Sequence, residues 1–176
     1  MMRMHRSLLS ILGAAALAGG CAHNPAPASQ SALADAGVAR DLERVRTVTR
    51  VYRDTAVARA AGYPIMTSPP CLSDSTAGAM GHHYVNRALV DNRVELDHPE
   101  ILLYAPVKGG GLKLVAVEYI IPYRLMPRDT VPPQIFGRPM LQNDPLKLWN
   151  LHVWAFEENP SGLFAEWNPA IECIKP

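Results

Sequence analysis

The sequence predicts an α+β domain in which one N-terminal amphipathic helix packs on a mostly antiparallel β-sheet, as an open roll or a sandwich. Three observations lead to this prediction. A helical apolar stripe is confined to residues 41–61. The apolar runs that follow have the length and the β-branched and aromatic content of strands. Pro occupies 16 of the 176 positions, which disfavours a helical bundle and favours strands joined by stiff loops.

Residues 41–61 carry the helix signal. Asp41 suits the N-cap position and Gly62 is a natural left-handed stop. The face opposite the apolar one is rich in arginine, and we expect it to be solvated. At 100° per residue the apolar face collects Leu42, Val45, Val48, Tyr52, Ala56 and Ala60.

Four segments are predicted strands. Residues 80–86 form a short strand, and residues 100–106 and 112–122 flank a triple glycine, which predicts an antiparallel hairpin. Residues 148–156 form the last strong strand. The segment between the last two strands, 123–147, contains five prolines and predicts a long, irregular crossing of the kind that often lines a site. Residues 63–79 are likewise predicted to be a loop.

The first twenty residues are predicted to be a signal peptide. Arg3 and Arg6 form a basic start, and residues 8–17 form an apolar stretch too short to serve as a comfortable membrane span. The stretch ends in small residues followed by Cys21, a pattern that resembles a bacterial lipobox. The alternative is ordinary cleavage near residues 14–16, which would leave Cys21 as a free thiol.

The lipobox interpretation predicts a lipid on Cys21 and a flexible tether over residues 21–38, rich in Pro, Ala and Ser. Residues 39–176 then form a single globular domain. A diacyl or triacyl anchor would hold the protein on a membrane of the bacterial cell envelope, facing the periplasm or the outside. Protein partners are unknown at this stage.

The charge excludes one class of partner. The whole chain has 17 basic and 16 acidic residues, and loss of residues 1–20 leaves 15 basic and 16 acidic. A nearly balanced chain offers no electrostatic basis for binding nucleic acid. No transmembrane span follows the predicted signal peptide.

Cys71 and Cys173 are left as a pair once Cys21 carries lipid. In an exported protein such a pair predicts a disulfide, here closing a loop of about a hundred residues. The alternative, two metal-binding thiols, lacks a CxxC spacing and a nearby His.

Several short motifs resemble a family of uncharacterised exported bacterial proteins, over about residues 40–173. The resemblance implies an exported single domain and brings no activity, substrate or catalytic residue. The motifs are Gly78-x-Met80-Gly81-x-His83-Tyr84-Val85-Asn86, Pro99-Glu100-x-Leu102-Leu103-Tyr104, Val115-x-Val117-Glu118-Tyr119, His152-x-Trp154, and Asn159-Pro160-x-Gly162-x-Phe164-Ala165-x-Trp167-Asn168-Pro169.

Glu118 is the first candidate site residue. It lies in the middle of a predicted strand that is apolar on both faces, which indicates burial on both faces. A carboxylate there must be paired, protonated or bound to something, because an isolated buried charge is costly.

Two histidines can share that interior. His152 lies in a second apolar strand, where alternation places it on the face of Asn150 and Trp154. His82 and His83 are adjacent and must point to opposite faces, and the family motif favours His83.

Two interpretations of His83, Glu118 and His152 stay open. Two imidazoles and a carboxylate from three strands suit zinc, iron, manganese or copper, with an open position for a ligand or water. A buried hydrogen-bonded network that fixes strand register uses the same residues. We therefore predict an envelope lipoprotein that binds a metal or a small ligand, with a metal-dependent enzyme or a purely structural or interaction lipoprotein as alternatives.

Overall fold

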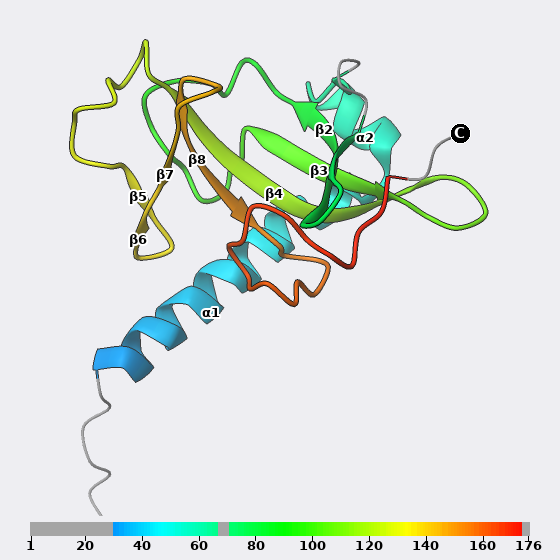
Figure 1. The fold of residues 1–176 in the computed structure, drawn as a ribbon, viewed down its shortest axis with the longest axis horizontal. Helices are drawn as coiled ribbons and strands as arrows, with labels where there is room; N and C mark the ends of the chain where they lie inside the picture. The colour runs from blue at the N-terminus through cyan, green and yellow to red at the C-terminus, as the bar shows by residue number, and fades with distance from the viewer. Residues whose placement is uncertain (1–29, 67–70, 174–176) are drawn as a thin grey trace, which may run out of the picture.

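A computed structural model of the chain describes residues 30–66 and 71–173. The predicted signal peptide and Cys21 lie outside these residues. Two antiparallel sheets and an N-terminal helical segment make up the fold, so the α+β prediction is confirmed (Figure 1). The main sheet is a single curled layer, which agrees with the open roll and not with the sandwich. Its strand order is β1-β2-β3-β4-β8-β7, and all of its pairs are antiparallel.

The helical segment has three parts: α1 (Gln30–Thr49), the 3₁₀ turn η1 (Arg50–Arg53) and α2 (Thr55–Ala60). A single helix over residues 41–61 was therefore wrong in detail. The β-branched residues at 47, 48, 49 and 51 weaken the helix, and the Thr49 hydroxyl donates to the Val45 carbonyl. Asp54 then caps α2 by accepting a hydrogen bond from the Ala56 N–H.

The start of the helix is a second correction. Residues 30–38 fall within the predicted tether, but α1 already begins at Gln30. This segment has three Ala, one Leu and no Pro, so helix propensity outweighs the composition that suggested a tether. The N-terminal half of α1 extends away from the sheet (Figure 1).

The central strands agree closely with prediction. β4 covers Leu112–Pro122, β3 covers Ile101–Pro106, and β2 covers Gly78–Val85. β8 is shorter than predicted, Leu148–Val153, because its regular pairing with β4 ends at Val153. The Trp154 N–H donates to the Leu163 carbonyl and the Phe156 N–H to the Val115 carbonyl.

Short strands fill the two predicted loops. β1 (Leu72–Asp74) pairs with β2 at one edge, and β7 (Leu141–Asn143) pairs with β8 at the other. β5 (Gln134–Ile135) and β6 (Arg138–Pro139) form a separate hairpin. Strands of two or three residues carry too little alternation to be predicted from sequence.

The two faces of the main sheet have different coverings. The larger core packs Val45 and Ala58 from the helical segment, with Tyr63 just after it, against one face. This face includes Leu102 and Tyr119. The other face carries a smaller apolar cluster and the polar residues described below. Within the described part of the chain, no helix combines the length and apolar character needed to cross a bilayer.

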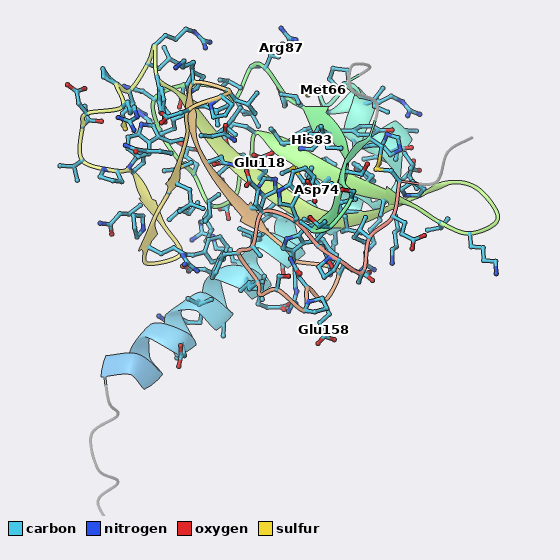
Figure 2. The ribbon with its side chains drawn as sticks, viewed as in Figure 1. Met66, Asp74, His83, Arg87, Glu118 and Glu158 are labelled. Atoms are coloured by element: carbon cyan, nitrogen blue, oxygen red, sulfur yellow. A yellow bond between two sulfur atoms is a disulfide. The ribbon has the colours of Figure 1, made fainter. Side chains whose placement is uncertain are left out.

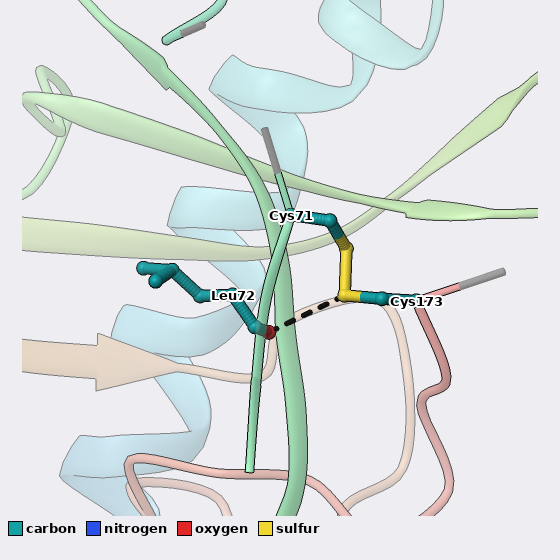
Figure 3. Close-up of a disulfide and its surroundings, with 3 residues drawn as sticks. All are labelled: Cys71, Leu72 and Cys173. Atoms are coloured by element: carbon teal, nitrogen blue, oxygen red, sulfur yellow. Dashed lines mark hydrogen bonds between the residues drawn. A yellow bond between two sulfur atoms is a disulfide. The ribbon is translucent and has the colours of Figure 1, made fainter. Parts of the chain in front are cut away.

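The predicted disulfide is present. Cys71 and Cys173 are bonded and join the residue before β1 to the C-terminal segment (Figure 3). The Cys173 Sγ also lies 3.4 Å from the Leu72 carbonyl oxygen. A disulfide sulfur has no proton to donate, so this is a packing contact.

Candidate metal centre

His83, Glu118 and His152 come together on the face of the sheet opposite the helical segment. Each offers one ligand atom, and the three atoms all lie within 4.8 Å of one another. His83 therefore joins the cluster and His82 does not, as the alternation and the motif predicted.

Strand register explains why these three side chains lie close together. Glu118 on β4 is directly opposite His152 on β8, so their side chains are neighbours on one face. His83 lies on β2, with β3 between it and β4. Strands two places apart are about 9.5 Å apart, so the His83 and Glu118 side chains bridge β3 by leaning toward each other. The two residues lie near each other over the sheet in Figure 2.

All three side chains are removed from water. The residues are 7%, 5% and 3% exposed, in chain order. Glu118 Oε2 lies 3.6 Å from His83 Nε2 and 3.6 Å from His152 Nε2. These separations are too long for hydrogen bonds. The two imidazole rings are perpendicular, with their centroids 6.4 Å apart.

The hydrogen bonding of two atoms distinguishes a structural network from a ligand site. His152 Nε2 is buried and has no hydrogen-bond partner in the described part of the chain. Glu118 Oε1 accepts one hydrogen bond, 3.3 Å long, from the Asn150 side-chain amide. A structural network should satisfy its buried polar atoms, and this one leaves an imidazole nitrogen of His152 unpaired among the described residues.

Burial is the main cause of the pKa shifts of the three side chains. It lowers the pKa of His152 to about 4, with a smaller opposing effect from Glu166. Burial also lowers the pKa of His83, which Glu118 partly offsets. Burial raises the pKa of Glu118, against smaller lowering effects of His83 and Asn150. Both imidazoles are therefore neutral at pH 7, which is the form that binds metals.

The donor set fits a transition metal. With bonds of about 2 Å at tetrahedral angles, two ligand atoms are about 3.3 Å apart. The two 3.6 Å separations from Glu118 need only small movements, whereas the two imidazole nitrogens, within 4.8 Å of each other, would have to move closer together. A divalent cation would also lower the pKa of Glu118 and supply the missing partner of His152 Nε2. Three protein ligands leave at least one position open.

A cavity of about 640 Å³ adjoins the cluster, and all three residues line it. Gln142, Asn143 and Leu146 from the predicted proline-rich crossing also line it, as expected for that segment. Leu146 is 66% exposed, so the cavity opens to solvent on that side.

Sequence reasoning missed three polar residues near the site. Asn150 was placed on the correct face by alternation, but its bond to Glu118 was not foreseen. Glu166 lines the cavity from the C-terminal segment, which no periodic pattern connects to the sheet. Glu100, 2% exposed, accepts a hydrogen bond from the Ile120 N–H, and burial raises its pKa to about 8.

Comparison of this chain with models of protein families, with curated proteins and with solved structures gave no match. The chemistry of the site therefore follows from its own residues and geometry.

Proposed function

We propose that this protein is a metal-binding module of the bacterial cell envelope that holds a divalent transition metal between His83, Glu118 and His152. The observation that carries the proposal is the convergence of three buried ligand atoms within 4.8 Å, while His152 Nε2 has no hydrogen-bond partner among the described residues. Zinc, iron(II) and copper are the ions that this donor set suits. A ligand could reach a bound metal from the cavity, because all three residues line it.

Elemental analysis of the purified protein tests the proposal. Near-stoichiometric metal is expected in the wild type and almost none in His152→Ala. His98→Ala is the matched control, because His98 is exposed and its ring pairs with Glu95, away from the cluster. A wild type without metal, or equal metal content in both variants, would refute the proposal. A large loss of thermal stability in His152→Ala without any metal would indicate the structural network instead.

The envelope location is part of the proposal. It is supported by the basic and apolar start of the chain, the small residues before Cys21, and the presence of a disulfide, which persists in oxidising compartments. Mass spectrometry of the mature N-terminus should find diacylglycerol on Cys21. Cys21→Ser should release the protein from membranes, whereas an unmodified N-terminus elsewhere would refute the anchor.

A metal-dependent enzyme is the second candidate, favoured by one observation. Glu166 lines the cavity and is half-buried, so it offers a carboxylate outside the proposed ligand set, as acid–base catalysis requires. Hydrolysis of activated esters by the metal-loaded protein, lost in Glu166→Gln with metal content unchanged, would establish this function.

A further inference from the structure

The cavity beside the metal cluster is far larger than an ion needs. Its volume of about 640 Å³ lies in the range of sites for small organic molecules, about 300–1,000 Å³. Most of its wall is apolar. The apolar side chains come from strands of the main sheet, from neighbouring loops and from the C-terminal segment. These apolar residues include Met80, Val85, Ile101, Ile120, Leu148 and Trp167.

The polar part of the wall restricts the charge of a ligand. Among the described residues that line the cavity there is no Lys or Arg. Two carboxylates, Glu118 and Glu166, line it and would balance a divalent ion. A ligand with several negative charges, such as a phosphate or a dicarboxylate, would therefore find no compensating cation beyond the metal. The amides of Asn143 and Gln142 offer neutral hydrogen bonds instead.

We infer that the cavity binds a neutral or singly charged organic molecule, with an apolar ring or chain against the wall and one oxygen-donor head group on the open position of the metal. This inference rests on the proposed function, because the metal anchors the head group. The apolar wall supplies the specificity, since burial of a ring removes apolar surface from water. Leu146, at the exposed side, marks the entrance.

Two hydroxamic acids with the same head group test the inference. The full-length protein is loaded with Co²⁺, whose visible absorption bands change when a ligand coordinates. Acetohydroxamate and benzohydroxamate are titrated separately, and they differ only in methyl against phenyl. We expect benzohydroxamate to bind about tenfold more tightly or better, because only its ring reaches the apolar wall.

A wall variant identifies the surface responsible. Leu148→Trp places a larger side chain into the cavity without touching a proposed ligand, and should reduce the preference for the ring to about threefold or less. Leu125→Trp is the control, since Leu125 is 39% exposed and does not line the cavity. It should keep the full preference. Both variants should take up as much cobalt as the wild type.

The outcomes separate the two proposals. Equal affinities for the two hydroxamates in the cobalt-loaded wild type, or a full preference retained in Leu148→Trp, would overturn this inference alone. Failure of the wild type to take up cobalt, or equal uptake by His152→Ala, would overturn the metal site and this inference with it.

Discussion

The Nε2 atom of His152 is the atom that distinguishes the two interpretations of the site. It is buried and no group in residues 30–66 or 71–173 forms a hydrogen bond with it. It lies 3.6 Å from a carboxylate oxygen of Glu118 that is equally far from His83 Nε2. An unpaired buried nitrogen costs about 1–3 kcal/mol in a purely structural arrangement. Coordination of a cation would use the lone pairs of both imidazoles and the charge of Glu118 together.

The substitution Glu118→Gln tests whether the carboxylate of this single residue is a metal ligand. Gln has almost the shape of a protonated Glu, and burial already favours the protonated form of Glu118. We expect a loss of metal affinity of about 100-fold or more, because a neutral amide is a poor ligand. The melting temperature of the metal-free variant should stay within a few degrees of the metal-free wild type. A large loss of stability in the metal-free protein would contradict the ligand role.

Glu100 predicts a pH dependence of stability. Its pKa is about 8 in the folded protein against an ordinary value of 4.5, chiefly because of burial. Between these values the unfolded chain releases a proton that the folded chain keeps, so the free energy of unfolding falls as the pH rises from about 4.5 to about 8. The fall is on the order of a few kcal/mol.

Glu100→Gln should remove this contribution. Denaturant titrations of the metal-free proteins at pH 5 and pH 9 measure it, with the difference between wild type and variant isolating Glu100 from other groups. The variant should gain stability relative to the wild type at the higher pH. An identical pH dependence in both proteins would show that the carboxyl titrates normally.

At the scale of the element, β2 depends on a glycine. Gly81 has φ of 95°, and a Cβ there would lie 2.5 Å from the Tyr104 carbonyl oxygen of β3. Gly81→Ala must push β2 away from β3, two residues before His83. We expect a loss of about 2–4 kcal/mol in the free energy of unfolding and weaker metal binding.

Gly109→Ala is the matched control. Gly109 has φ of 93°, but nothing lies within 4 Å of its Cβ position. It should cost about 1 kcal/mol from backbone strain alone and leave metal content unchanged. Thermal unfolding and elemental analysis compare the two variants. Equal costs would show that the close approach to Tyr104 does not constrain the strand.

The elements also show which features a sequence can predict. β4 was predicted to the residue, because it is a long apolar run bounded by a triple glycine and Pro122. Alternation within strong strands identified His152 and Glu118 as interior residues. The helix break after Thr49 depends on competing side-chain hydrogen bonds, and β1 and β7 depend on partners that are distant in sequence. The burial of Glu100 also depends on residues distant in sequence, such as Ile120. No local sequence pattern therefore predicts it.

At the scale of the whole molecule, one disulfide closes a loop of the chain that contains the sheet. The Cys71–Cys173 disulfide joins residues 102 positions apart, and all the described strands lie between them. The double variant Cys71→Ser, Cys173→Ser should lose about 2–5 kcal/mol of unfolding free energy, mainly because its unfolded chain is less restricted. Urea titration measures this loss. An unchanged midpoint would mean that the link contributes nothing.

The same variant should keep its metal. The proposed ligands lie on β2, β4 and β8, which pair within the sheet independently of the disulfide. Metal content of the folded double variant should therefore equal that of the wild type, and its loss would place the disulfide among the supports of the site.

The central claim is that one metal ion joins three strands of this sheet. Anomalous diffraction from crystals of the purified protein, recorded at the absorption edge of the metal found by elemental analysis, tests it most directly. We expect one strong anomalous peak about 2.0–2.2 Å from His83 Nε2, His152 Nε2 and a Glu118 carboxylate oxygen. No peak there, with the three side chains hydrogen-bonded to one another or to water, would contradict it.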